Sequence, residues 1–478
     1  MARGIFTSAT VNLTIDVKED NPIPNDHAGI TSRRDVFTLV TSVLASSLAF
    51  IDGSVVNVGL PAIGHGLGSD AAGLQWLIGI YLLPLSALLL FGGALGDHFG
   101  RRRILIWGTL LFGLASTACG LAPSLPMLIA ARFVQGVGAA LLMPNSLAVL
   151  GATFNGAQRG RAIGIWAAAG AATGAAGPVI GGWLIDAVSW RMIFFINVPL
   201  AALAVVLARF AIRPETLEDP PPLDLAGAGL ATVGLGTLTW GLISGSGPVG
   251  WAPAPAAGVV AGFILLAFFV IWEGKMGERA MMPLSLFGSR GFVGLTLLTL
   301  LLYGALGGFL LLLPYVLIQA DSYTSTEAGL ALLPLPLLLS VMSPLMGRLA
   351  GRSGSRRLLI IGPLVVAAGF LLMLRVEGDS SYWIAVLPSL VVTSVGLACA
   401  VAPLTTAVLA VDMSHTGSAS GFNSAIARSG GLVATALMGS VLARNGPALI
   451  NGFHVAIILA ALACIAAAAS ALLTTRGS

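Results

Sequence analysis

The segment that decides the fold covers residues 50–61 and reads FIDGSVVNVGLP. It closes an apolar run over 36–58 in which Asp52 is the only charged residue. That run is long enough to cross a bilayer, for which about 20 apolar residues suffice. An ionised carboxylate at this depth costs several kcal/mol unless it faces protein or a wet cavity. We therefore predict that Asp52 loads and releases a proton; the alternative is a buried polar group capped by Ser54 or Asn57.

Composition places the whole chain in a membrane. Hydrophobic residues make up 56% of the 478 residues and charged residues 9%, against about 25% charged residues in a soluble domain. The three cysteines, Cys119, Cys399 and Cys464, lie in apolar runs without metal-ligand spacing, so no disulfide, metal or cofactor is expected. A net charge of +4 is too small to favour a nucleic-acid partner. The expected surroundings are the lipid bilayer.

Apolar runs of about 20 residues predict an all-α polytopic protein with fourteen transmembrane helices. The expected spans are 36–58, 73–95, 104–122, 127–150, 162–185, 190–212, 225–244, 256–273, 291–318, 327–349, 357–375, 382–411, 417–442 and 452–473. This division gives a cytoplasmic polar tail 1–34, a six-helix bundle 35–212, a linker 213–290 with two extra helices, a second six-helix bundle 291–473 and a tail 474–478. The first tail has no apolar core and is not a cleaved signal peptide.

Positive charges predict the orientation of the spans. With the first tail inside, nineteen of the 24 Lys and Arg residues fall in cytoplasmic segments, as the positive-inside rule requires. Both termini are then cytoplasmic. Arg132 and Arg428 are the exceptions that lie within spans.

Two stretches repeat about 255 residues apart. The loop 93–103, GALGDHFGRRR, returns as 347–357, GRLAGRSGSRR, and three glycines of the fifth span return in the thirteenth. Paired six-helix halves with weak internal symmetry are typical of secondary transporters, with the site at the interface between the halves. The pair of helices over 225–273 belongs to neither half.

The first copy of this loop contains an acid among basic residues. Asp97 is absent from the repeat, where Gly351 replaces it, so it is interpreted as a one-sided latch that pairs with an arginine or a helix N-terminus. The arginines alone are also explained as a topology anchor. The predicted cytoplasmic gate loop consists of Gly93, Asp97, Gly100, Arg101 and Arg102.

This loop resembles the signature loop of the major facilitator superfamily. Residues 131–140, ARFVQGVGAA, resemble the fourth-helix motif of its drug:proton antiporters, and 174–182, GAAGPVIGG, their fifth-helix motif. Residues 50–61 and 189–199, SWRMIFFINVP, resemble the fourteen-helix branch. The departures are Gly53, Ser54 and Gly59, where that branch tends to have threonine and alanine. The likeness covers nearly the whole chain and implies the major facilitator fold, proton-coupled drug export, and a part for Arg132 in proton transfer.

The positions of Asp52 and Arg132 along their expected spans place the two residues at the same depth in the membrane. At 1.5 Å per residue, both lie about 8–9 Å below the outer boundary of their spans. An arginine there would keep Asp52 ionised when close and let it protonate when apart; the alternative is an arginine that snorkels outward.

A Gly-Pro step in the fifth span predicts a hinge or seal. Proline removes a helix hydrogen bond and glycines allow close helix approach, although small residues in membrane helices usually mean packing alone. The residues assigned to this feature are Gly174, Gly177, Pro178, Gly181 and Gly182.

Polar and aromatic residues within other spans are candidates for a substrate cavity, each also explicable as packing. They are Asn57, Gln135, Asn145, Trp166, Tyr303, Gln319, Asn423 and Arg428.

The sequence therefore predicts a multi-pass protein of a bacterial plasma membrane that exports amphipathic, drug-like molecules in exchange for protons. A dedicated exporter of one endogenous metabolite or antibiotic is the close alternative. A multi-pass lipid enzyme would need paired acids or a His/Cys constellation, and a receptor or scaffold would not need an intramembrane Asp/Arg pair. Nothing in the sequence sets the oligomeric state, and a monomer is the simplest expectation.

Overall fold

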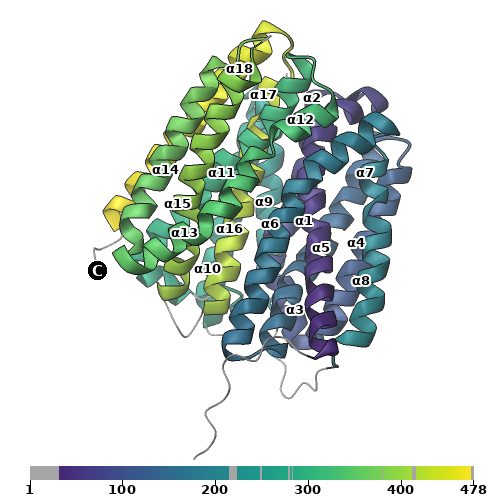
Figure 1. Cartoon of the computed structure of the whole chain (residues 1–478), viewed down its shortest axis with the longest axis vertical. Helices are drawn as coiled ribbons and strands as arrows, with labels where there is room; N and C mark the ends of the chain where they lie inside the picture. Colours follow the sequence, from purple (N-terminus) through teal and green to yellow (C-terminus); the bar gives the residue numbers. More distant parts are fainter. Residues whose placement is uncertain are drawn as a thin grey trace, which may run out of the picture.

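The computed structural model describes residues 32–214, 223–247, 250–277, 280–282, 284–378, 380–411 and 416–474. The described part is a bundle of helices (Figure 1). Most of the two predicted tails and of the stretch 214–224 lies outside the described residues.

The first group of helices forms one side of the molecule, drawn in purple to blue in Figure 1. Its members are α1 (Arg33–Leu67), α2 (Ala71–Ala87), α3 (Leu89–Phe99), α4 (Arg101–Leu121), α5 (Leu125–Thr153), α6 (Gly156–Ala187), α7 (Met192–Phe195) and α8 (Asn197–Ala211). Helices α4 and α5 pack together, and α1 packs against α5, α6 and α8. The start of α1 lies beside the end of α8, where Arg34 Nε donates to the carbonyl of Ala211 at 3.0 Å.

The last group of helices forms the opposite side, drawn in green to yellow. It comprises α11 (Arg290–Gln319), α12 (Ser325–Ala331), α13 (Pro334–Ser353), α14 (Ser355–Leu372), α15 (Leu387–Val411), α16 (Thr416–Leu437), α17 (Gly439–Leu442) and α18 (Pro447–Thr474), with 3₁₀ turns at Leu284–Gly288 and Met373–Arg375 and a π turn at Tyr382–Val386. Helices α14 and α15 pack together, and α11 packs against α16 and α18.

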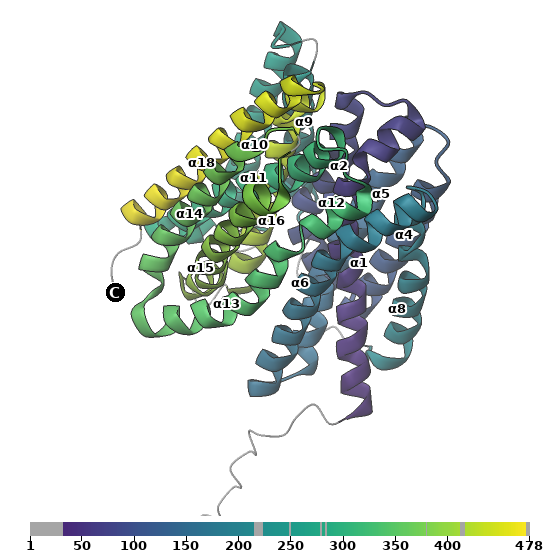
Figure 2. The same ribbon diagram turned by 45° about the horizontal axis from the view of Figure 1, so that its top comes forward.

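Two helices stand between these groups in the sequence. Helices α9 (Leu225–Ser246) and α10 (Pro253–Met276) pack against each other, and α9 also packs against α2 and α16. Figure 2 shows both of them beside the last group of helices. Because α10 packs mainly on α9, the apolar side chains of Phe263, Phe268 and Ile271 remain exposed on it. Such a face suits contact with lipid.

The prediction of fourteen spans is met only in part. Among the described residues, twelve helices are long and apolar enough to cross a membrane, and the pair α2 and α3, bent by 48°, makes a thirteenth. Helix α16 coincides with the remaining expected span but is less apolar, because it carries Asn423 and Arg428 and several glycines and serines. The bend follows Pro84, a common cause of helix kinks.

The repeat recognised in the sequence recurs as a repeated turn. Gly100 joins α3 to α4 with φ 97°, and Gly354 joins α13 to α14 with φ 79°. Positive φ is accessible to glycine at little cost. The two loops therefore share a backbone conformation that explains why both copies contain glycine at this position.

Candidate functional site

The site is centred on Asp52 in the middle part of α1. Its carboxylate is fully buried and accepts hydrogen bonds from Arg132 Nη1 and, at 2.8 Å, from Gln135 Nε2. Both partners lie on α5, one helical turn apart, so they reach the same carboxylate. Arg132 Nη1 also donates to Gln135 Oε1 at 2.9 Å. The three side chains form a closed, charge-assisted network within two membrane-spanning helices.

Two further helices complete the network. Asn197, the first residue of α8, donates from Nδ2 to Asp52 Oδ1 at 3.4 Å and to Ser116 Oγ of α4 at 3.1 Å. Ser116 in turn accepts from Gln135 Nε2 at 3.2 Å and donates to the carbonyl of Phe194 at 2.8 Å. Sequence reasoning did not assign Asn197 or Ser116. Asn197 could have been assigned from the sequence, because it is the only amide side chain in the span 190–212 and belongs to the motif at 189–199.

Arg132 is enclosed on its remaining sides. Its guanidinium carbon lies 4.1 Å from the ring centroid of Tyr81 and 5.9 Å from that of Phe194, and Nε donates to the carbonyl of Leu77 at 3.4 Å. Only 1% of Arg132 is exposed. The arginine therefore does not snorkel to the surface; it is a buried counter-ion to Asp52, held by ion pair, hydrogen bonds and cation–π contact.

A small cavity borders this network. It has a volume of about 200 Å³ and is lined by Arg132 and Tyr81 from the first group of helices and by Tyr303 and Arg428 from the last. Asn57 lines it from α1. The cavity thus lies where the two groups of helices face each other, and three of the predicted substrate-cavity residues, Asn57, Tyr303 and Arg428, meet there.

Arg428 has an unusual position in this cavity. Its Nη2 donates to the sulfur of Met143 at 3.0 Å, and it has no carboxylate partner among the described residues. The cavity therefore presents two guanidinium groups, one of which, that of Arg132, is paired with Asp52.

Four other predicted cavity residues lie outside both described cavities, and their place in a substrate cavity stays a prediction. Asn145 donates to the carbonyl of Gly92 at 2.8 Å and holds α3 to α5. Trp166 donates to Ser146 Oγ at 3.2 Å, and Asn423 accepts from Thr299 Oγ1 at 2.6 Å. Gln319 is the last residue of α11 and lines neither described cavity. Isolated polar residues in these spans mainly satisfy neighbouring helices, a role that spacing alone does not distinguish from ligand binding.

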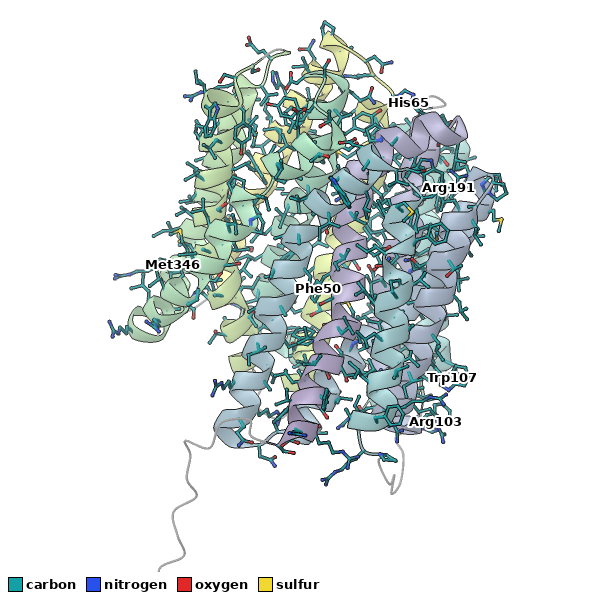
Figure 3. All side chains as sticks on the ribbon, turned by 45° about the vertical axis from the view of Figure 1, so that its right-hand side comes forward. Phe50, His65, Arg103, Trp107, Arg191 and Met346 are labelled. Atoms are coloured by element: carbon teal, nitrogen blue, oxygen red, sulfur yellow. The ribbon has the colours of Figure 1, made fainter. Side chains whose placement is uncertain are left out.

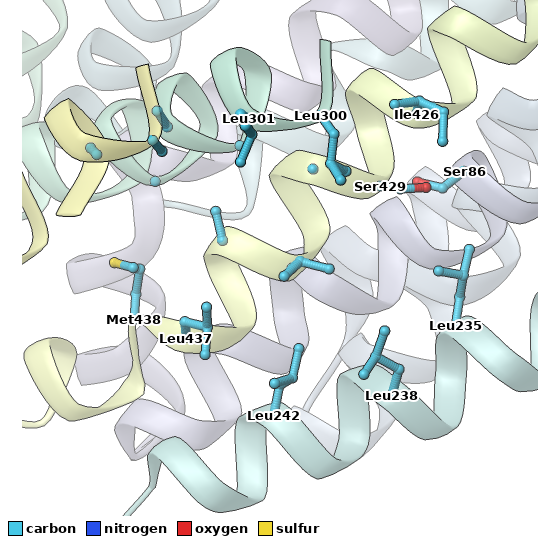
Figure 4. A pocket seen from close by; sticks show the side chains of 18 of the residues that line it. Ser86, Leu235, Leu238, Leu242, Leu300, Leu301, Ile426, Ser429, Leu437 and Met438 are labelled. Atoms are coloured by element: carbon cyan, nitrogen blue, oxygen red, sulfur yellow. The ribbon is translucent and has the colours of Figure 1, made fainter. Parts of the chain in front are cut away.

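A second, larger cavity lies between the central helix pair and the last group of helices. Its volume is about 850 Å³, and α9, α11 and α16 supply much of its mostly apolar lining. Figure 4 shows Leu235, Leu238 and Leu242 of α9 on one side of this space and Leu437 and Ile426 of α16 on the other, with Ser86 and Ser429 also in its lining. A cavity of this size and polarity suits an apolar or amphipathic molecule.

The glycines of the fifth-helix motif pack α6 closely against two neighbours. A Cβ on Gly177 or Gly181 would clash with Ser54 or Val55 of α1, and one on Gly182 would clash with the backbone of Ser325 in α12. Gly174 has open space instead. Helix α6 continues through Pro178 from Gly156 to Ala187. The motif therefore provides close packing, and part of that packing crosses between the two groups of helices.

Two polar contacts hold the same end of the molecule together. The Asp186 carboxylate at the end of α6 accepts from the backbone nitrogens of Ser325 and Thr326 at 3.2 and 2.8 Å, so it caps α12 of the other group. Gln75 Nε2 of α2 donates to the carbonyls of Thr435 and Ala436 of α16 at 3.0 and 2.9 Å. Charge-assisted capping and buried amide bonds of this kind fix one helix group against the other.

The predicted gate loop lies at the opposite end. Figure 3 shows Arg103 and Trp107 at that end and His65 and Arg191 at the other. Asp97 Oδ1 accepts from Arg101 Nε and Nη2 at 3.0 and 2.9 Å, and the pair is partly exposed. Arg102 Nη2 donates to the carbonyl of Arg209 at 2.7 Å. All these contacts stay within the first group of helices.

Comparison with known proteins identifies the family. The family model described as Major Facilitator Superfamily matches residues 42–317 and 295–477. The chain therefore belongs to the major facilitator superfamily, and it is a multi-pass membrane protein with a transporter fold.

Relatives of known name are antibiotic resistance and export proteins. The chain is 34% identical over 414 residues to Multidrug resistance protein Stp of Mycobacterium tuberculosis, covering 86% of this chain and 76% of that one. It is 32% identical over 410 residues to the Tetracenomycin C resistance and export protein of Streptomyces glaucescens, covering 85% and 76%. It is 34% identical over 409 residues to Puromycin resistance protein pur8 of Streptomyces alboniger, covering 84% and 81%.

Solved structures share the fold at lower identity. A bacterial homologue of the human lysosomal transporter Spinster, in an inward-facing and occupied conformation, superposes with a TM-score of 0.66 at 16% identity and covers 93% of this chain and 97% of that one. A D-xylose-proton symporter gives 0.64 at 16% identity, covering 92% and 98%.

Proposed function

We propose that this protein is a proton-coupled exporter of amphipathic small molecules in a bacterial plasma membrane. The observation that carries the proposal is the fully buried Asp52–Arg132 pair beside a cavity between the two groups of helices. Relatives that share about a third of its sequence bear the names of multidrug and antibiotic resistance proteins. An intramembrane ion pair is expensive to maintain and marks an ion pathway by default.

The ion pair acts as an exchange site for a proton. Separating Asp52 from Arg132 would leave a buried carboxylate without a counter-ion, which costs about 3–5 kcal/mol. A proton taken up by Asp52 removes that cost, so protonation and release of Arg132 occur together. Arg132 is then free to turn toward the small cavity that it already lines. Proton binding and cavity shape are thereby coupled through one side chain.

The two ends of the molecule form the gates of an alternating-access cycle. The α6–α12 and α2–α16 contacts close the outer end, and the loop with Asp97 lies at the cytoplasmic end, where α1 begins. A Cβ on Gly160 or Gly164 of α6 would meet nothing within 4 Å, as would one on Gly347 of α13. We therefore assign the described conformation to the state that is open to the cytoplasm, on the basis of the contacts that join the two groups at the outer end.

The topology follows from the same assignment. Both termini are cytoplasmic, and α16 is the thirteenth span along the chain, which completes the set of fourteen; its polar residues face other helices and the small cavity rather than lipid. Asn423 bonds to Thr299 of α11, and Arg428 lines the cavity. Cysteine labelling from each side of the membrane tests this arrangement.

Transport into everted membrane vesicles tests the function. We expect an imposed pH gradient to drive uptake of amphipathic aromatic compounds from a panel of antibiotics and dyes, and a protonophore to abolish it. A vesicle preparation without the protein is the control. Uptake of one compound alone would identify a dedicated exporter, and absence of proton-dependent uptake across the panel would contradict the proposal.

A further inference from the structure

A buried pair of acids lies outside the Asp52 site, at the end of the central helix pair. Asp224 precedes α9 and Glu273 lies in the last turn of α10, and they are 3% and 1% exposed. Asp224 Oδ1 accepts from the backbone nitrogen of Gly227 at 2.8 Å and from Trp272 Nε1 at 3.0 Å. Glu273 Oε2 accepts from the backbone nitrogen of Met282 at 2.7 Å.

The second oxygen of each acid has no hydrogen-bond donor. Asp224 Oδ2 and Glu273 Oε1 are both buried and without a partner. They converge on one point, because a Cβ added to Gly227 would clash with both of them. Two acceptors that face each other in a buried site repel each other unless a donor lies between them. A single proton between the two oxygens would supply the missing donor and remove the repulsion.

We propose that Asp224 and Glu273 share one proton and form a second proton-binding site, separate from Asp52. The shared proton turns one carboxyl group into a donor and leaves the other as its acceptor, so both orphan oxygens are satisfied. Other charged groups on the adjoining described elements are Lys275 of α10 and Arg290 of α11, which are exposed and make no ion pair with either acid. Within the described ranges, no cation is paired with either acid, so the proton has no competitor there.

The site couples proton occupancy to the junction between the central helices and the last group. Glu273 holds the backbone of Met282, whose side chain is 4% exposed and packs in the main apolar core just before α11. Loss of the proton would place two negative charges together and push the acceptor away from Met282. Release of the proton is thus expected to loosen the attachment of α10 to the segment that leads into α11.

Infrared spectroscopy of the purified protein in lipid nanodiscs tests the shared proton. At neutral pH we expect a protonated-carboxyl C=O band that the double variant Asp224→Asn/Glu273→Gln loses. Gly227→Ala, which inserts a methyl group between the oxygens, should shift or remove the band. Gly229→Ala is the matched control, because a Cβ there meets nothing within 4 Å. A band that persists unchanged in the double variant, or no band in the wild type, would overturn the proposal.

A stability measurement uses only the two glycine variants and involves no acid substitution. The native state with a shared proton binds more protons at neutral pH than the unfolded chain, so its stability falls as pH rises. We expect this fall in thermal stability to be flatter in Gly227→Ala than in Gly229→Ala. Equal slopes would contradict the shared proton. Neither experiment contains a transported compound, so the result is independent of the proposed export function.

Discussion

Arg132 contacts more groups at once than the ammonium group of a lysine could contact. It contacts Asp52, Gln135, the Leu77 carbonyl and the Tyr81 ring at once, which only a planar guanidinium with several donors can do. The Asp52 site therefore depends on the planar shape of the Arg132 guanidinium as well as on its charge. These contacts explain how one ion pair remains stable in the membrane interior, and the proposed cycle opens it when a proton replaces the arginine.

The first prediction at the residue scale concerns stability. Arg132→Ala leaves Asp52 buried without a counter-ion and should destabilise the protein by about 3–5 kcal/mol. The double variant Asp52→Asn/Arg132→Ala should recover much of that loss, because the uncompensated charge is gone. Thermal unfolding in detergent measures this double-mutant cycle. Equal destabilisation of the single and double variants would mean that packing, not charge, holds Arg132.

A conservative replacement gives the second prediction. Arg132→Lys keeps the charge but loses the fork that reaches Asp52 and Gln135 together. We expect normal expression and a loss of proton-driven transport of at least about tenfold, which corresponds to about 1.4 kcal/mol. Lys275→Arg, an exposed change of the same kind on α10, is the control. Transport rates in vesicles at matched protein level decide the comparison.

At the scale of elements, apolar length predicted where helices lie but not how they break. Each of the fourteen expected ranges is largely helical, because a membrane requires long apolar helices and the sequence supplies them, but several are broken and at most thirteen qualify as candidate spans among the described residues. The breaks at Leu88 and Ile196 were not predicted, since each depends on neighbouring helices as well as on local sequence. The partners of Asp52 on α5 were foreseeable from depth and motif, whereas Ser116 depends on tertiary packing.

The contact between α6 and α12 gives a prediction about the end of the molecule where they meet. Asp186→Asn removes the charge that caps α12 and should shift the population toward opening at that end. Spin labels at the exposed positions Val188 and Leu330 would report a longer distance. Asp70→Asn, which changes a helix cap within the first group, is the control. An unchanged distance distribution would show that the glycine contacts alone keep this end closed.

Removal of the acid in the gate loop should instead favour opening at the opposite end of the molecule. Asp97 pairs with Arg101 in the described conformation, and on the proposed cycle its charge is available to the other group when the cytoplasmic end closes. Asp97→Asn should therefore increase the open population, although an exposed pair contributes only about 1 kcal/mol or less. Labels at Phe99 and Leu345 measure the effect. A shift toward the closed form would reverse the proposed role of this acid.

At the scale of the whole molecule, cavity charge predicts substrate choice. Arg132 and Arg428 both line the small cavity, and no carboxylate lines it among the described residues. A dication would bring a second positive charge into a site whose nearest acid is paired, at a cost of several kcal/mol. Neutral, zwitterionic and singly cationic amphiphiles should be exported much better than dications. Efflux of matched mono- and dicationic aromatic compounds measures this, and comparable rates would mean that another acid reaches the substrate.

The most direct test of proton coupling compares uphill transport with exchange in Asp52→Asn. This variant keeps the hydrogen bonds of a polar side chain but cannot cycle a proton. In proteoliposomes, we expect it to lose pH-driven accumulation of substrate while it retains exchange of labelled for unlabelled substrate. Asp35→Asn, at the first turn of the same helix, should keep both activities. Accumulation against a gradient by Asp52→Asn at the wild-type level would contradict the assignment of Asp52 as the coupling residue.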